Sequence, residues 1–344
     1  MASILNLGKI ESSSATCGTL VSHMRVLLCA ILATSMAAAP ATARRRAVTA
    51  PSSCFSTVLA QAATATLVTD SDSVYYGDGE SLGVYRVAKT GGMPVLLASF
   101  SCCLVTRMAA DDESVYVAVQ PFGDAIRSPN DTWLRTIYAI PKSGGPAVML
   151  ASGVSLVKEL AAADGFVYWA SLGTIVNNPE FASDGKIERV RRDGTERTTL
   201  ASGLSGPTSV ALDETFVYFA ESGLARGNSS SGARRVPKEG GLVQRLYDRA
   251  VDFLAVNGND LYMITDSGSR NTITQALKDG SQVKRSVSDL PIINPTMTIF
   301  GGRVYYLTET KSAFAVASVT LNLHGRPLHS DRLFNTGQIV VHSC

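Results

Sequence analysis

A short apolar strand built around a tyrosine recurs six times in this 344-residue chain. The six tyrosines follow one another at intervals of 41 to 52 residues: Tyr75, Tyr116, Tyr168, Tyr218, Tyr262 and Tyr305. Eight residues before each tyrosine stands an apolar residue, and a polar turn lies between the two positions. This spacing predicts a pair of antiparallel strands in each repeat. Self-similarity at such a period indicates a stacked architecture in which neighbouring units bury each other's faces.

Two further strands follow each tyrosine strand. The third ends in a turn of basic residues and glycine, as in Lys89–Gly92 and Lys142–Gly145, and the fourth reads like Val95–Ser99. Glycine supplies the positive φ that tight hairpins require. Four short strands in each of six repeats predict an all-β, six-bladed β-propeller with four antiparallel strands per blade. The predicted blades lie near 64–99, 106–152, 157–202, 207–247, 251–287 and 295–330.

Closure of the ring requires the two ends of the chain to meet. Residues Thr57–Gln61 match the fourth-strand pattern, so we expect this N-terminal segment to be the outer strand of the last blade. Such pairing removes an exposed sheet edge. Residues 327–344 compete for the same position.

The first 43 residues have the layout of a secretory signal peptide with an upstream extension. Met24-Arg25 is a short basic start, Val26–Ala39 is an apolar core, and Ala41–Ala43 is a small-residue cleavage site. The apolar run is too short for a membrane span. We therefore expect cleavage near Ala43, export to the periplasm, the cell surface or the medium, and a single propeller domain over 44–344.

Export leaves four cysteines in an oxidising compartment, namely Cys54, Cys102, Cys103 and Cys344. Cys54 and Cys344 flank the predicted seam of the ring, and we predict that they are bonded. Strand direction places Cys54 away from the link that holds Cys102 and Cys103. Those two form either an adjacent disulfide, which strains the turn, or two free thiols.

The third repeat resembles a known family. Val167–Ser171 followed by Lys186–Thr195 is similar to the Tyr-Trp-Thr-Asp repeat of the low-density-lipoprotein receptor group, whose units also occur in exported bacterial proteins. The resemblance covers residues 57–330. Only Tyr168-Trp169 keeps the aromatic pair, and only Thr265-Asp266 keeps the second half. The resemblance implies a six-bladed propeller that binds proteins, and it implies no catalytic residues.

Composition and motifs give little support for an enzyme. The net charge is +2, so nucleic acid is not an expected partner. After the signal peptide, histidine occurs only in the last 21 residues, as His324, His329 and His342. No nucleophile elbow, zinc spacing or phosphate-binding glycine loop is present. The acidic turns before the tyrosine strands favour turn formation over calcium binding. We expect no cofactor and no metal.

Four charged residues fall at the predicted start of inner strands, where ligands enter propellers: Arg107, Lys158, Glu159 and Asp252. They either line the mouth of a channel for a small polar ligand or pair with one another and keep the channel hydrated.

The links that follow the tyrosine strands lie on the same predicted face, and three neighbouring ones are long: Gln120–Trp133, Leu172–Gly185 and Ser222–Gly232. Loops on a rigid scaffold carry function, and interfaces favour aromatic residues and arginine. The candidate binding residues on this rim are Phe122, Arg127, Trp133, Glu180, Phe181 and Arg226. Tolerated loop growth explains the same pattern without a function.

These observations favour an exported, monomeric, non-catalytic propeller that binds a protein or glycan through the loop-rich face of blades 2–4. One alternative is a propeller hydrolase or lyase that uses channel acids such as Glu159 and Asp252. Another is a surface adhesion or assembly module.

Overall fold

The computed structural model describes residues 55–62, 64–101, 103–121, 135–177, 180–223, 230–266, 270–300, 303–309, 314–319 and 338–343. Within these ranges the chain consists of β-strands, turns and irregular links, and it contains no helix. None of the described segments is therefore a helix that crosses a membrane.

Five antiparallel sheets have four strands, and each is built from strands in or close to chain order. The first contains β2 (Thr64–Thr69), β3 (Ser73–Asp78), β4 (Gly83–Ala88) and β5 (Val95–Ser99). The second contains β6 (Cys103–Ala110), β7 (Ser114–Pro121), β8 (Thr136–Pro141) and β9 (Val148–Ser152). The third contains β10 (Val157–Ala163), β11 (Phe166–Ser171), β14 (Gly185–Arg191) and β15 (Thr198–Leu204).

The fourth sheet contains β16 (Pro207–Leu212), β17 (Phe216–Ser222), β18 (Ser231–Pro237) and β19 (Gln244–Tyr247). The fifth contains β20 (Phe253–Asn257), β21 (Asp260–Asp266), β22 (Asn271–Leu277) and β23 (Val283–Leu290). A further sheet has three described strands, β24 (Ile292–Phe300), β25 (Arg303–Glu309) and β26 (Phe314–Val319).

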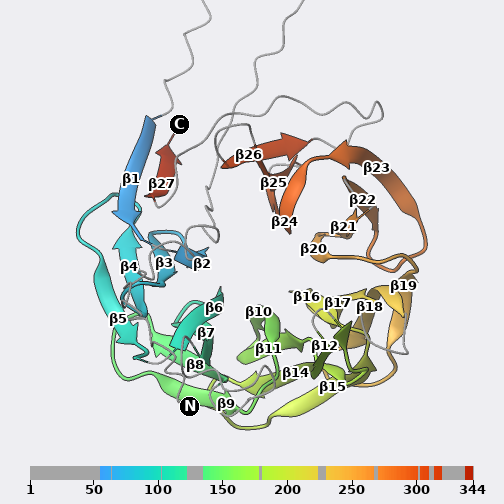
Figure 1. Ribbon diagram of the computed structural model, residues 1–344, viewed down its shortest axis with the longest axis horizontal. Helices are drawn as coiled ribbons and strands as arrows, with labels where there is room; N and C mark the ends of the chain where they lie inside the picture. The colour runs from blue at the N-terminus through green and yellow to red at the C-terminus, as the bar shows by residue number, and fades with distance from the viewer. Residues whose placement is uncertain are drawn as a thin grey trace, which may run out of the picture.

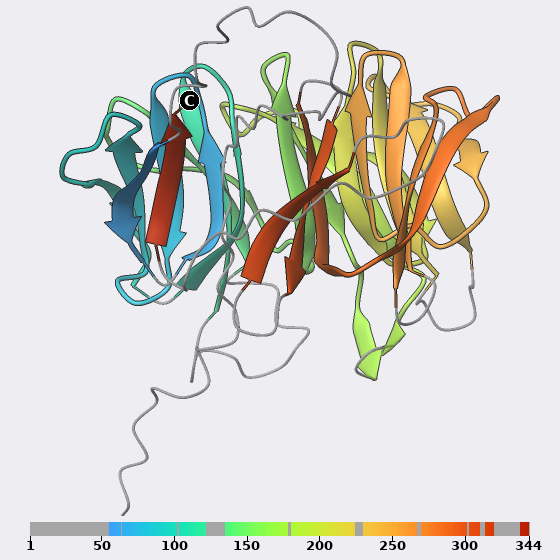
Figure 2. The same ribbon diagram turned by 90° about the horizontal axis from the view of Figure 1, so that it is seen from above.

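The sheets stand around a common centre like the blades of a propeller (Figure 1), and Figure 2 shows them side by side from the edge of the ring. The first strand of each sheet is innermost, and the tyrosine strand is second. The predicted all-β propeller fold is confirmed.

Burial follows position in the blade. The tyrosine strand β11 is buried at five consecutive residues, because sheets on both sides cover its two faces. The outer strand β9 is instead exposed at both Val148 and Met149. A continuous apolar run thus forms the second strand, and a partly exposed strand completes the sheet.

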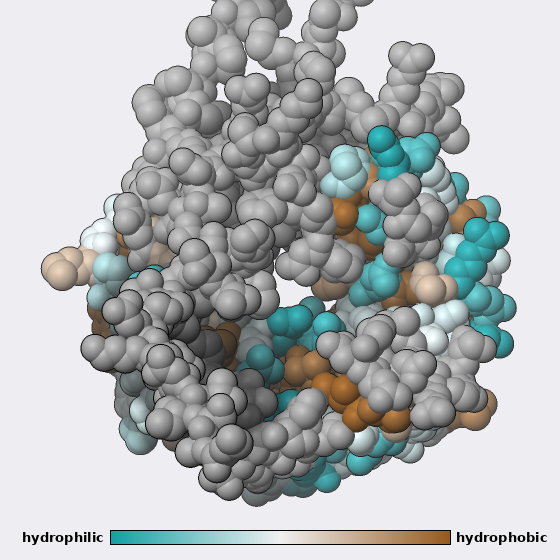
Figure 3. All heavy atoms as spheres, in the orientation of Figure 1, coloured by the Kyte–Doolittle hydropathy of each residue, from teal (hydrophilic) through white to brown (hydrophobic). Residues whose placement is uncertain are grey.

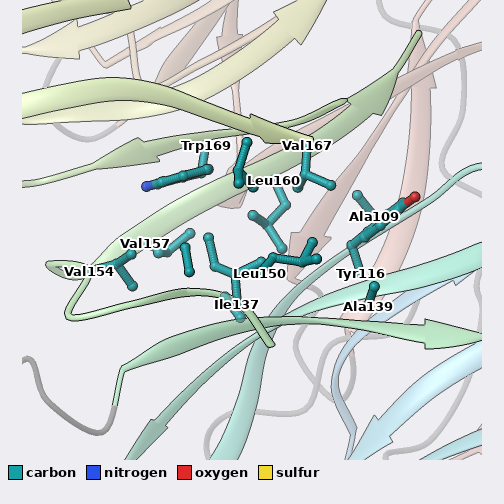
Figure 4. Close-up of a cluster of buried hydrophobic side chains, with 13 residues drawn as sticks. Ala109, Tyr116, Ile137, Ala139, Leu150, Val154, Val157, Leu160, Val167 and Trp169 are labelled. Atoms are coloured by element: carbon teal, nitrogen blue, oxygen red, sulfur yellow. The ribbon is translucent and has the colours of Figure 1, made fainter. Parts of the chain in front are cut away.

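Apolar cores lie between adjacent sheets. Figure 4 shows one of them, in which Tyr116 and Ile137 of the second sheet pack with Leu160, Val167 and Trp169 of the third. Trp169 is fully buried. Since no sheet covers both of its faces alone, this packing joins the blades into one body.

The two ends of the described chain pair with each other. Strand β1 (Phe55–Gln61) lies antiparallel to β27 (Gln338–Ser343), with Phe55 opposite Ser343. Leu59 and Ala60 of β1 pack against the first sheet, next to Val74. Within the described strands β26 pairs only with β25. Among the described strands, β1 therefore pairs with the competing C-terminal segment and not, as predicted, with the outer edge of the last blade.

Ion pairs connect consecutive sheets at one face of the ring. In the second to fifth sheets, the basic residue in the turn after the third strand reaches an acid in the preceding sheet. The four pairs are Lys142 with Asp70 (2.7 Å), Arg192 with Glu113 (2.9 Å), Lys238 with Asp164 (2.6 Å) and Lys278 with Asp213 (2.8 Å). We call these pairs the inter-blade clasps. They lie at the turn between the first and second strands, the end opposite to the long links.

Candidate ligand-binding face

The inner strands share a β-bulge near the end opposite to the clasps. The register of β6 against β7 skips Thr106, and that of β10 against β11 skips Lys158. Strand β16 skips Thr208 in the same way. A bulge leaves one residue outside the ladder and re-aims neighbouring side chains. Each bulge therefore presents two consecutive side chains at the inner strand instead of one.

The pattern of buried side chains confirms that each bulge adds one residue to its inner strand. Val157 and Leu160 lie in the same core although they are three residues apart, whereas regular strands return to the same face every two residues. Val105 and Met108 repeat this spacing in the second sheet. The sequence carries this signal as a three-residue interval between apolar positions, which alternation alone does not reveal.

Arg107 joins two bulges at the channel. Its Nε donates to the carbonyl oxygen of Lys158 at 2.5 Å, and one terminal nitrogen donates to the carbonyl oxygen of Thr106 at 2.6 Å. Both acceptors are backbone atoms of bulge residues. The guanidinium is thus held in place by neutral groups.

Lys158 and Glu159 stand together at the bulge of β10, and both side chains are half-buried. Burial raises the pKa of Glu159 to about 7 against the opposing charges of Arg107 and Lys158. Burial, followed by repulsion from Arg107, lowers the pKa of Lys158. Three of the four predicted channel-mouth residues therefore come together, which the sequence alone did not establish.

Asp252, the fourth, precedes β20 at the same end of the ring, where its backbone nitrogen donates to the carbonyl oxygen of Ile264 at 2.9 Å. Asp252 has a further interaction besides this hydrogen bond. The structure records no contact of Asp252 with Lys158 or Glu159.

A β-hairpin projects from this face between β11 and β14. It consists of β12 (Ile175–Asn177) and β13 (Glu180–Phe181), and Figure 2 shows it extending beyond the ring. Thr174 at its base donates from both its backbone nitrogen and its hydroxyl to Asp184, at 2.8 and 2.6 Å. The hairpin is thereby fixed to the blade and presents Val176, which is 42% exposed.

Phe181 is buried, although the sequence predicted it to lie on the exposed rim. Its side chain is only 9% exposed. Phe181 therefore stabilises the hairpin instead of presenting an aromatic surface. Glu180 lies in the same short strand. Phe122, Arg127, Trp133 and Arg226 lie outside the described residues.

The base of the link in the fourth blade holds an ion pair that the sequence did not reveal. Glu221 is 2% exposed and accepts a hydrogen bond from the backbone nitrogen of Ser205 at 2.9 Å. Its other oxygen pairs with Arg234, which also donates to Ser230. All hydrogen-bonding partners come from the ends of neighbouring strands, so this pair fixes the scaffold beneath the link.

The acidic turns at the opposite face have structural partners. Asp70, Asp111 and Asp213 each accept two backbone N–H groups of their own turn and the hydroxyl of the tyrosine five residues later. This is the turn-forming role that aspartate performs in many proteins. Within the described residues no cluster of three metal-ligating side chains occurs.

Cys103 begins β6, is buried and is disulfide-bonded. Cys54, Cys102 and Cys344 lie outside the described residues, so the pairing of the cysteines stays a prediction.

No family model and no curated protein matches this chain. Solved structures with a similar fold include a nidogen/laminin complex, at 15% identity and a TM-score of 0.51, covering 77% of this chain and 96% of the other. YCF48 bound to D1 peptide has 10% identity and a TM-score of 0.53, covering 79% and 82%. Oligogalacturonate lyase in complex with manganese has 10% identity and a TM-score of 0.54, covering 74% and 75%. At these identities the likeness concerns the fold alone.

Proposed function

We propose that this chain is an exported, monomeric six-bladed propeller that binds a protein or glycan partner through the face carrying the β12–β13 hairpin. The single observation behind this is that the hairpin, pinned by Asp184, stands at the same end of the ring as the Arg107–Lys158–Glu159 group. The clasps occupy the other end. The clasps thus tie one face together, and the other face holds a projecting hairpin beside the Arg107–Lys158–Glu159 group.

The solved structures with a similar fold include both binding proteins and an enzyme, so the fold is compatible with either role. A laminin complex and a peptide complex are among them, and so is a lyase. From these structures we transfer only one property to this chain, namely the general use of propellers as binding scaffolds. The six-bladed count, the signal peptide ending near Ala43 and the single domain over 44–344 belong to the same proposal.

A photo-crosslinking residue at Val176 tests the binding face. Cells that make the protein are irradiated, and the products are compared with those from a crosslinker at Val148, which is exposed on outer strand β9. We expect a defined product from position 176 and none from position 148. Replacing residues 175–181 with Asn-Gly should abolish competition by unlabelled protein. Equal products from both positions would overturn the proposal.

A second candidate is a hydrolase or lyase, because a carboxyl group with a pKa near 7 suits general acid–base chemistry. Cleavage of a glycan or ester that disappears in Glu159→Gln while the fold is retained would favour this candidate. Retention of that cleavage in the variant would exclude it.

A further inference from the structure

Side chains at the bulges of the inner strands bind the next inner strand. Arg107 reaches the carbonyl oxygen of Lys158 on β10. Thr208 donates to the carbonyl oxygen of Val251 at 3.3 Å, and Ser209 donates to that of Leu254 on β20 at 3.3 Å. These contacts connect β6 to β10 and β16 to β20. Side chains at these bulges therefore stabilise the ring by joining one inner strand to the next.

The bulge of β10 departs from this pattern. Glu159 accepts a hydrogen bond from its own neighbour, the backbone nitrogen of Leu160, at 3.2 Å. Within the part of the chain that the structure describes, the ammonium of Lys158 makes no hydrogen bond or ion pair. The bulge residues of the neighbouring inner strand β16 are the uncharged Thr208 and Ser209. Within the described residues, the charged side chains of Lys158 and Glu159 therefore make no hydrogen bond to the next inner strand.

The local charge is positive. Arg107 is held by two carbonyl oxygens, so no carboxylate in hydrogen-bond contact neutralises it. Within the described residues no carboxylate makes a hydrogen bond or ion pair with Lys158, and burial with repulsion from Arg107 lowers its pKa. Among the described residues, Glu159 is the acid that interacts with both, and at neutral pH it is only partly ionised because its pKa is raised to about 7. Two cationic groups face one partial anion, which favours a bound anion.

The surface around these charges has an apolar part. Figure 3 shows an opening at the centre of the ring with hydrophilic residues along its edge. The β12–β13 hairpin grows from the end of β11, whose last residue Ser171 lies opposite Val157, next to Lys158. Val176 of the hairpin is exposed, and Ile175 is half-buried. An anionic group and an apolar side chain can therefore be bound at the same end of the ring.

We propose that the channel mouth binds a carboxylate of an acidic peptide segment through Lys158 and Arg107, with an apolar residue of that segment against Val176. This inference rests on the proposed binding face and names the chemistry of its partner. A peptide fits better than an acidic glycan, because a peptide presents carboxylates and aliphatic side chains together. Lys158 supplies a charge-assisted hydrogen bond, which its ammonium does not make to any of the described residues.

Synthetic peptides test the site directly. The probes are a labelled peptide containing Leu-Glu-Glu-Leu, its Leu-Gln-Gln-Leu counterpart, and trigalacturonate as an acidic glycan. Fluorescence anisotropy measures binding of the peptides to the full chain, and calorimetry measures binding of the sugar. We expect the glutamine peptide to bind about tenfold more weakly or not at all, which corresponds to the loss of one charge-assisted contact.

Matched variants locate the contact. Lys158→Met and Lys158→Gln should each weaken the acidic peptide by about tenfold, whereas Lys186→Met, which removes an exposed lysine from the same blade, should leave affinity within about twofold. Melting curves verify that all variants fold. Equal binding of both peptides, unchanged binding in both Lys158 variants, or binding of trigalacturonate alone overturns the inference. If no peptide binds while crosslinking at position 176 succeeds, the inference fails and the proposed face stands.

Discussion

The ammonium of Lys142 lies 2.7 Å from a carboxylate oxygen of Asp70, which is 72 residues earlier in the chain and in the preceding sheet. The same oxygen accepts the hydroxyl of Tyr75 at 2.9 Å. One carboxylate thus closes its own turn, orients the repeated tyrosine and binds the next blade. Asp213 makes the same contacts with Tyr218 and Lys278. The repeated tyrosines and the acidic turns therefore take part in the same set of contacts, which joins each blade to the next.

Removing a clasp should weaken the ring. We expect Lys142→Met to lower the free energy of unfolding by about 1 kcal/mol, because the pair is largely shielded from water. A double-mutant cycle with Asp70→Asn in urea measures the coupling between the two groups. The matched control is Arg245→Met, which breaks an exposed pair with Asp248 and should change stability by no more than about 0.3 kcal/mol. A coupling energy of zero for Lys142 and Asp70 would contradict the clasp.

Acid should weaken the same contacts in a defined range. Burial raises the pKa of Asp213, but the hydrogen bonds from Lys278 and from two backbone N–H groups outweigh it, so the pKa falls to about 2. A depressed folded-state pKa means that the unfolded chain takes up protons first as pH falls. We expect the stability that Asp213 contributes to be present above about pH 4 and lost towards pH 2.

Urea unfolding at several pH values measures this loss. Asp213→Asn should flatten the fall in stability between pH 4 and pH 2 relative to the unmodified protein, because the titrating group is gone. An identical slope in the variant would show that other carboxylates cause the acid sensitivity.

Glu159 should act in the opposite sense. Its folded-state pKa is raised to about 7, so between the ordinary glutamate pKa and pH 7 the folded protein holds more protons than the unfolded chain. Stability contributed by this group therefore falls as pH rises through that range. We expect Glu159→Gln to raise the free energy of unfolding on the order of 2 kcal/mol at pH 8 and to have no effect below pH 4. A stabilisation that is the same at both pH values would refute this assignment.

Gly232 should tolerate no side chain. Its φ is +135°, and a Cβ there would lie 1.9 Å from the carbonyl oxygen of Tyr247. We expect Gly232→Ala to destabilise the protein by about 3 kcal/mol or more, since backbone atoms must move. Gly203→Ala is the control, because φ is also positive there (+70°) but no atom lies within 4 Å of the added carbon. Its cost should be about 1 kcal/mol. Comparable losses from both variants would mean that φ, not crowding, sets the cost.

The predicted Cys54–Cys344 disulfide can be tested directly. Phe55 lies opposite Ser343, and the two cysteines are the next residues outward in the sequence. We expect non-reducing peptide mapping to recover both cysteines in one fragment. Cys344→Ser should lower the free energy of unfolding by about 2–4 kcal/mol, because the closed loop spans almost the whole domain. Recovery of both cysteines as free thiols would disprove the bond.

Much of the blade was predictable from local signals. The interval between tyrosines, the glycine turns after Lys89 and Lys142, and the apolar fourth strands predicted sheets that the structure contains. The five-residue interval from Asp70 to Tyr75 and from Asp213 to Tyr218 is also visible in the sequence, although its meaning as a hydrogen bond was not. These features depend on neighbours along the chain, and so the sequence carries them.

The candidate site was only partly predictable. Arg107, Lys158 and Glu159 were placed at the channel mouth from strand direction, but their contacts depend on bulges that shift the register by one residue. Phe181 was expected to be exposed, yet it is buried in the short β12–β13 hairpin. Neither outcome follows from alternation, because a single inserted residue changes which face a side chain occupies.

The amino-acid sequence by itself determined the repeated strands, the turns between them and the all-β propeller class, because strand alternation and glycine turns are set by residues close together in the chain. Only the tertiary structure decided that Asp70 meets Lys142, that β1 pairs with β27 and that Arg107 meets the backbone of Lys158. Those contacts join residues far apart in the sequence, and their geometry depends on how whole sheets pack against one another.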